Sequence, residues 1–202
     1  MAFSSRFWKS WVQEGESVLF KVLCCGFLWG LAEVYLGGLI KSWQPALFGF
    51  LLPFIISLLL LWARWWVPAT GSLLLMGVIA ATLKLFVSGM VFHGAFLAIL
   101  VEALLAEVIF LLAGINLFSF SLIGIAIQFY SLFHPLLSKG VFCQSSHFVL
   151  FKRWLERFLF PGAQTTLSDS TTSLILILTH LLVGLLSGLI SWFLIRSVFD
   201  HK

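Results

Sequence analysis

Charged residues are scarce in this sequence. Asp, Glu, Lys and Arg make up 10% of its 202 residues, whereas a typical soluble domain carries about a quarter. Hydrophobic residues account for 61% of the chain, and its mean hydropathy is +1.09. A water-soluble fold of this size cannot hide so many apolar side chains, because much of its surface still faces solvent. The composition therefore excludes an ordinary soluble domain and indicates lipid as the solvent.

Several motifs that define function classes are missing. The sequence has no His-Glu-x-x-His, no Gly-x-Ser-x-Gly and no Walker-type phosphate loop, so we expect neither an enzyme of these kinds nor a nucleotide site. Its three cysteines, Cys24, Cys25 and Cys143, have no disulfide or metal spacing. The net charge of +4 is small and scattered, which argues against a nucleic-acid surface. We expect no catalytic residue, no metal and no cofactor in this chain.

Long apolar runs fill most of the chain. A helix needs about 20 apolar residues to cross a bilayer, so six such runs use up most of the length. We expect an all-α integral membrane protein with about six transmembrane helices in one bundle over residues 18–196. The predicted spans are about 18–40, 46–63, 71–92, 95–113, 117–137 and 173–195. Residues 1–17 are predicted to be an interfacial tail, and residues 197–202 a second tail.

The longest connection, residues 139–172, contains an amphipathic segment at 147–160. Apolar residues recur there at i, i+3 and i+4 spacing, with charges on the opposite face. The apolar positions are Phe148, Phe151, Trp154, Leu155 and Phe158, and the polar ones are Lys152, Arg153, Glu156 and Arg157. This pattern predicts a helix in the membrane interface.

Basic residues near the spans are evenly divided between the two sides. With an inside N-terminus, five are cytoplasmic (Arg6, Lys9, Arg64, Arg196, Lys202) and five are outside (Lys41, Lys139, Lys152, Arg153, Arg157). The tail and the first short loops favour an inside N-terminus, and early helices usually dominate. We therefore expect a multi-pass protein of the plasma membrane with a cytoplasmic N-terminus.

Four ionisable residues fall at one depth among the spans. Counting about 1.5 Å per residue from each span's centre places Glu33, Lys84, Glu102 and His180 within roughly 3–6 Å of the midplane, in the same half of the bilayer. Tyr130 falls at a similar depth. A charged side chain there costs at least ~2.5 kcal/mol on insertion, so each is a functional candidate. We predict a substrate site to which these five residues contribute.

Structural roles are open for the same residues. Lys84 could neutralise Glu33 or Glu102 in a buried pair that fixes helix register. His180 could be a hydrogen-bonded packing residue. The carboxylates of Glu33, Glu102 and Glu107 nevertheless outnumber Lys84 within the bundle, and such a surplus either stays protonated or awaits a cation.

Glu107 cannot share one pocket equally with Glu102, because five residues along a helix turn it by about 140°. We expect Glu107 to pair with Lys21 or to contact a partner protein. His134, beside Pro135 near the end of the fifth predicted span, is expected either to line an entrance to the site or to lie in the interface.

Small residues four apart mark close helix contacts in two spans. Gly26-x-x-x-Gly30 lies in the first span and Gly184-x-x-x-Gly188 in the sixth. The contact is either internal packing or docking against another membrane subunit.

Three stretches in the first part of the chain carry a family resemblance. They are the small-residue run from Gly26 to Glu33, the turn from Arg64 to Gly71 that leads to Lys84, and the run from Glu102 to Glu107 that closes on Gly114. Their order resembles the substrate-binding membrane subunit, the S component, of energy-coupling factor (ECF) transporters. That family has six helices and a chain of similar length.

The resemblance implies a vitamin-uptake protein that binds its substrate near the outer face. It also implies a transmembrane coupling subunit and a pair of ATPases as partners, and these ATPases would use the ATP. Gly26 and Gly30 stand where the family has an Ala-x-x-x-Ala motif that faces the coupling subunit, so they are the predicted docking residues. The metal-binding branch has an N-terminal His motif that Met1-Ala-Phe-Ser lacks, which favours a small organic substrate.

In this interpretation Glu33, Glu102 and His180 bind a small polar or cationic nutrient, Lys84 sets the local charge and Tyr130 stacks on the ligand. One alternative is a stand-alone secondary transporter in which Glu33 or Glu102 takes up protons. Another is a structural or assembly protein whose charges only lock the bundle.

Overall fold

The computed structural model describes residues 15–87, 94–139, 146–161 and 166–199. Within these ranges the chain forms helices and no strand, and five helices are long and apolar enough to cross a membrane. The prediction of an all-α membrane bundle is therefore confirmed. Most of the predicted N-terminal tail and Cys143 lie outside the described residues.

The first span is one helical run whose winding changes near its middle. It comprises α2 (Gly15–Leu31), the π-helical turn η1 (Ala32–Leu36) and α3 (Gly37–Trp43). A 3-10 turn, η2 (Pro45–Leu47), begins with a proline, whose fixed φ suits the first position of a helix. It leads directly into the second span.

The second span, α4 (Phe48–Trp66), continues through Pro53 and ends later than the sequence predicts. The sequence places Arg64, Trp65 and Trp66 in a membrane-surface turn, but they belong to the helix. The N–H of Val67 still donates to the carbonyl of Ala63, at 2.8 Å, so the last turn is helical. The turn therefore begins only after this helix.

The next three helices are α5 (Ser72–Val87), α6 (Gly94–Ala113) and α7 (Leu117–Lys139). Helix α5 has 16 described residues and is shorter than the five long apolar helices; the end of its predicted span lies outside the described residues. Gly71 (φ 83°) precedes α5 and Gly114 (φ 72°) separates α6 from α7. Both take a left-handed conformation that glycine adopts without steric cost.

The chain ends with the amphipathic helix α8 (Ser146–Leu159) and the last span, α9 (Asp169–Phe199). Ser168 caps α9, because its Oγ accepts a hydrogen bond from the N–H of Thr171 at 3.1 Å.

Helix α8 uses its apolar face against the bundle. Phe148, Phe151 and Leu155 are buried and form a small hydrophobic cluster with Phe50, Leu132 and Leu176. On its polar face, Lys152 Nζ lies 2.6 Å from Asp169 Oδ1 at the start of α9. The helix is amphipathic, as predicted, and it is fixed to one end of the bundle.

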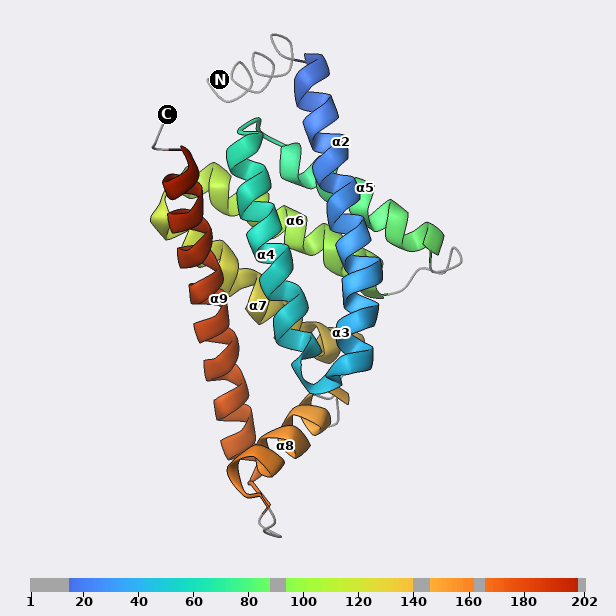
Figure 1. Cartoon of the computed structure of the whole chain (residues 1–202), viewed down its shortest axis with the longest axis vertical. Coiled ribbons are helices and arrows are strands. Elements are labelled where there is room, and N and C mark those ends of the chain that lie inside the picture. The colour runs from blue at the N-terminus through green and yellow to red at the C-terminus, as the bar shows by residue number, and fades with distance from the viewer. Residues whose placement is uncertain (1–14, 88–93, 140–145, 162–165, 200–202) are drawn as a thin grey trace.

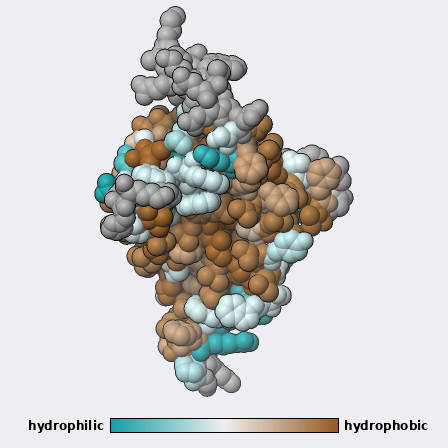
Figure 2. Space-filling view, turned by 45° about the horizontal axis from the view of Figure 1, so that its top comes forward, coloured by the Kyte–Doolittle hydropathy of each residue, from teal (hydrophilic) through white to brown (hydrophobic). Residues whose placement is uncertain are grey.

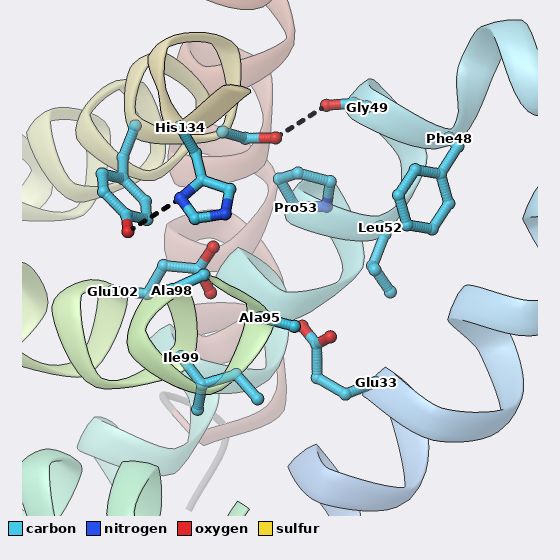
Figure 3. Close-up of a pocket in the computed structure, with 12 residues that line it drawn as sticks. Glu33, Phe48, Gly49, Leu52, Pro53, Ala95, Ala98, Ile99, Glu102 and His134 are labelled. Atoms are coloured by element: carbon cyan, nitrogen blue, oxygen red, sulfur yellow. Dashed lines mark hydrogen bonds between the residues drawn. The ribbon is translucent and has the colours of Figure 1, made fainter. Parts of the chain in front are cut away.

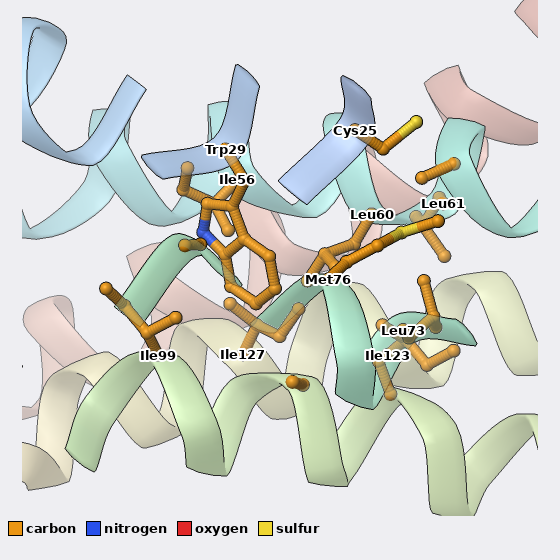
Figure 4. Close-up of a cluster of buried hydrophobic side chains, with 14 of the residues drawn as sticks. Cys25, Trp29, Ile56, Leu60, Leu61, Leu73, Met76, Ile99, Ile123 and Ile127 are labelled. Atoms are coloured by element: carbon orange, nitrogen blue, oxygen red, sulfur yellow. The ribbon is translucent and has the colours of Figure 1, made fainter. Parts of the chain in front are cut away.

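Successive spans pack in the order α2, α5, α6, α7, α9 and α4, and α4 also packs against α7 and α2. Helices α2, α4 and α9 run along the long axis of the molecule, and α5, α6 and α7 cross behind them (Figure 1). The start of α2 and the end of α9 lie at one end of the bundle, while α8 lies at the other (Figure 1). The interior is filled by large apolar side chains from several spans (Figure 4), among them Trp29, Ile56, Leu60, Met76, Ile99 and Ile123.

The outward face of the bundle is also apolar. Leu112 is 84% exposed and Phe20 is 65% exposed, and many other leucines and phenylalanines face outward. Figure 2 shows hydrophobic side chains across the middle of the visible face, with polar ones nearer its ends. Such a surface is expected for a multi-pass membrane protein, because lipid replaces water around the bundle.

Candidate functional site

A cavity of about 210 Å³ lies between the first span and helices α4, α6 and α7 (Figure 3). We call it the carboxylate cavity, because two glutamates face it. Its lining consists of Glu33, Phe48, Gly49, Leu52, Pro53, Ala95, Ala98, Ile99, Glu102, Tyr130, Ser131 and His134. Sites for drug-sized ligands measure ~300–1,000 Å³, so this cavity suits a smaller molecule.

Glu33 reaches the cavity from the π-helical turn of the first span. In that turn the N–H of Gly37 donates to the carbonyls of Ala32 and Val34, so the carbonyl of Glu33 is released from its usual i+4 donor. Lys84 of α5 donates to this carbonyl, with its Nζ 2.7 Å from the oxygen. The irregular turn thus creates an acceptor that an α-helix would have satisfied internally.

Lys84 also neutralises the side chain of Glu33. Its Nζ lies 3.8 Å from Glu33 Oε2, and the side chain of Lys84 is 25% exposed. Lys84 is not among the residues that line the cavity. It therefore acts on the cavity through Glu33, from the α5 side.

Glu102 of α6 is the second carboxylate, and Figure 3 shows it turned toward the same space as Glu33. The residue is 7% exposed, and its Oε2 is buried without a hydrogen-bond partner among the described residues. A buried carboxylate oxygen without a partner is costly, and a proton or a bound cation removes that cost. Among the described residues of the cavity, Glu102 is consequently the one that a bound cation would stabilise most.

Helix α7 supplies the opposite wall. The hydroxyl of Tyr130 lies 3.3 Å from His134 Nδ1, and the two residues are one helical turn apart. Ser131 Oγ donates to the carbonyl of Gly49 at 3.2 Å. That carbonyl lacks its normal helical donor, because Pro53 four residues later has no N–H.

His180 lies elsewhere. It is fully buried, its ring centroid is 4.3 Å from that of Phe50, and its Nδ1 is 2.9 Å from the carbonyl oxygen of Leu176. It is absent from the cavity lining. The structure thus brings Glu33, Glu102 and Tyr130 together and leaves His180 in a packing position.

Glu107 does not pair with Lys21, which corrects that expectation. Its Oε1 lies 3.3 Å from Arg64 Nη1 and accepts a hydrogen bond from the N–H of Gly71 at 2.7 Å. Its Oε2 accepts from the N–H of Leu73 at 3.1 Å. Lys21 instead lies with its Nζ 5.8 Å from the centroid of a Trp66 ring. Glu107 therefore fixes the α4–α5 turn to α6.

Gly26 and Gly30 are not available for docking, which corrects a second expectation. Both are buried against α5. A Cβ on Gly26 would lie 2.9 Å from Ile79 Cβ, and one on Gly30 would lie 2.8 Å from Leu83 Cδ2. The small residues allow α2 and α5 to approach each other closely, so the motif serves internal packing.

Two residues of the cavity wall cannot be predicted from the sequence. Ser131 and Gly49 carry no charge, so their predicted depth in the membrane does not mark them as candidates for a site. The proline inside α4 is a usable signal, because it implies a free carbonyl that a neighbouring side chain must satisfy. For His134 the sequence leaves open an entrance or the interface, and the residue lines the cavity.

The lining suits a small molecule with a positive group and an apolar part. Two carboxylates and a tyrosine hydroxyl offer acceptors, whereas Phe48, Leu52 and Ile99 offer apolar contact. Within the described part of the chain, no three His, Cys, Asp or Glu side chains are grouped so as to hold a metal ion. The apolar side chains of the lining suit the hydrocarbon part of an organic ligand.

Comparison of the chain with models of known protein families, with curated proteins and with solved structures gives no match.

Proposed function

We propose that the chain is the substrate-binding membrane subunit of an ATP-driven importer of the ECF type, for a small polar or cationic nutrient such as a vitamin. Its partners would be a transmembrane coupling subunit and a pair of ATPases. It would reside in the plasma membrane with a cytoplasmic N-terminus. In that orientation the carboxylate cavity lies in the outer half of the bilayer, on the side from which a substrate would enter.

One observation carries the proposal. Glu102 lines a cavity of about 210 Å³ inside a membrane bundle, and its Oε2 is buried with no hydrogen-bond partner in the described part of the chain. A charge that is expensive to bury and open to a cavity is what a binding site for a cation requires. The sequence offers no phosphate-binding loop, so energy for transport would come from other chains.

Binding by the purified protein tests the proposal directly. A panel of vitamins and small amines is screened for thermal stabilisation of the protein in nanodiscs. A ligand at 100 times its Kd stabilises the folded state by about 2.7 kcal/mol. We expect at least one stabilising ligand, whose effect is lost in Glu102→Gln and kept in Glu156→Gln, a control on α8 outside the cavity. If the ligand stabilises Glu102→Gln and Glu156→Gln equally, Glu102 does not contribute to the binding site.

Reconstitution separates the proposal from its main rival. We expect the protein alone in liposomes to bind the ligand without concentrating it, with or without a proton gradient. Uptake that needs only this chain and a proton gradient would overturn the proposal and identify a secondary transporter.

A further inference from the structure

We propose that the carboxylate cavity selects a small organic monocation and that Lys84 sets this valence. The inference rests on the proposed function only for the premise that the cavity binds a ligand. It adds the charge and the chemical class of that ligand, and it assigns Lys84 a role in specificity without direct contact.

The charge of the site follows from three side chains. Glu33 and Glu102 are the carboxylates in the cavity lining, and the lining includes no lysine or arginine among the described residues. Lys84 contacts Glu33 twice, at its carbonyl (2.7 Å) and at its carboxylate (3.8 Å). When all three are ionised, one negative charge remains uncompensated. That charge belongs to Glu102, whose Oε2 has no partner in the described part of the chain.

A second buried ion pair, which includes a residue of the same helix as Glu102, does not change this balance. Arg64 and Glu107 neutralise each other, and Glu107 lies five residues beyond Glu102 on α6. Both of their side chains are only 5% exposed. The cavity is thus matched to a ligand with one positive charge.

An alkyl ammonium group fits the polar part of the lining. It has three N–H donors, and the cavity lining includes acceptors on Glu102, Tyr130 and Glu33. The remaining wall, formed by Phe48, Leu52 and Ile99, would contact the hydrocarbon part of the same molecule. An inorganic cation would leave that apolar wall without a partner.

A matched set of probes tests the valence: 1-aminopentane, 1,5-diaminopentane and 1-pentanol. Their Kd values are measured by saturation-transfer NMR with the protein in nanodiscs at pH 8, where an imidazole with the usual pKa of about 6.5 is neutral. A variant with both Glu33→Gln and Glu102→Gln serves as the blank for partition into lipid. We expect the wild type to prefer the monoamine to the other two probes by at least tenfold.

Three variants change the charge stepwise. Lys84→Gln leaves two negative charges and should shift the preference at least tenfold toward the diamine. Glu33→Gln leaves Lys84 opposite Glu102 and should abolish the preference for amine over alcohol. Combining Glu33→Gln with Lys84→Gln restores one negative charge and should restore the preference for the monoamine. Such a recovery could not come from a variant that merely fails to fold.

The outcomes separate this inference from the proposed function. Equal binding of 1-pentanol and 1-aminopentane by the wild type would overturn the inference and leave ligand binding intact. If the variant with Glu33→Gln and Lys84→Gln binds 1-aminopentane no better than 1-pentanol, the proposed role of Lys84 is overturned. Absence of binding by all three probes would also overturn the inference, whereas failure of ATP-driven import with monoamine binding retained would overturn only the proposed function.

Discussion

Arg64 and Glu107 form a buried ion pair that also holds backbone in place. Both side chains are 5% exposed, and Arg64 Nη1 donates to the carbonyl of Ala69 at 2.8 Å while Glu107 accepts the N–H groups of Gly71 and Leu73. The pair therefore joins α4, the turn after it and α6. An arginine that the sequence places at the membrane surface is part of the core.

Replacing Glu107 by glutamine should destabilise the fold strongly. The amide has one acceptor oxygen for three donors, and it leaves the Arg64 guanidinium buried without a counter-charge. Breaking a buried pair in this way costs about 3–5 kcal/mol. The free energy of unfolding in detergent micelles measures the loss.

The exposed pair at the other end of the molecule is the matched control. Asp169 of the Lys152–Asp169 pair is 62% exposed at its side chain. Asp169→Asn should therefore cost at most about 1 kcal/mol. Similar losses for the two variants would show that the Arg64–Glu107 pair does not support the fold.

At the level of single residues, the sequence predicts part of the group that lines the cavity but not the direction of each side chain. Position along an apolar run predicts a similar depth for Glu33, Glu102 and Tyr130, and all three line the cavity. The same reasoning gives His180 a similar depth, yet its ring lies against Phe50. Helix α9 is apolar on all sides, so its sequence does not reveal which face meets which neighbour.

Helix α4 depends on α7 where Pro53 interrupts its hydrogen bonds. Ser131 Oγ donates to the carbonyl of Gly49, and Gln128 Nε2 donates to that of Phe50 at 3.0 Å. Two polar side chains of one helix thus complete the backbone of another. The cavity wall is built at this junction.

A double-mutant cycle tests this dependence. Ser131→Ala leaves the Gly49 carbonyl without a donor and should cost about 1 kcal/mol of unfolding free energy in the wild type. In a Pro53→Ala background the helix supplies its own N–H, so the same change should cost almost nothing. Equal costs in both backgrounds would contradict the proposed link between Ser131 and the proline.

Helices α7 and α9 approach each other through glycines. A Cβ on Gly184 would lie 2.7 Å from the carbonyl oxygen of Gly124 and 2.7 Å from the Cα of Ile125. Because these are backbone atoms, Gly184→Ala must separate the helices. We expect a loss of about 2–3 kcal/mol in unfolding free energy, as for an overpacked core.

Gly38 provides the opposite control for that substitution. It is an exposed residue of α3, and a Cβ added there would meet no atom within 4 Å. Gly38→Ala should stabilise the helix by about 0.5–1 kcal/mol, because alanine loses less backbone entropy on folding. A loss at Gly38 as well would show that Gly→Ala destabilises this bundle without a steric clash, and the loss at Gly184 could then not be assigned to close contact.

The helices themselves could be predicted from apolar runs, but the irregular turn at Ala32–Leu36 could not. Glu33 lies in a run of ordinary helix-compatible residues, and nothing in that run marks a π-helical turn. The turn is recognisable only from its partner, since Lys84 of α5 satisfies the carbonyl that it releases. The contact that satisfies this carbonyl joins residues 51 positions apart, so the local sequence around Glu33 does not predict it.

At the scale of the whole molecule, burial of Arg64 changes the argument about orientation. A basic residue paired with Glu107 inside the bundle is not a loop charge, so it no longer counts toward the cytoplasmic side. What the fold does provide is a clear separation of ends: α8 lies opposite the start of α2 and the end of α9 (Figure 1). Counting α5 with the five long apolar helices gives six crossings. An even number of crossings returns the end of α9 to the side of the bundle where α2 begins.

Cysteine labelling in intact cells tests both the topology and the proposed orientation. In a background with Cys24, Cys25 and Cys143 replaced by alanine, single cysteines are introduced at Arg153 on α8 and at Ser197 near the end of α9, both of which are exposed. A membrane-impermeant maleimide should label Arg153→Cys from outside and Ser197→Cys only after the membrane is opened. The reverse pattern would place the N-terminus outside and the carboxylate cavity in the inner half. Labelling of both from one side would show that α9 does not carry the chain across the bilayer between these two positions, and the six-span topology would then be wrong.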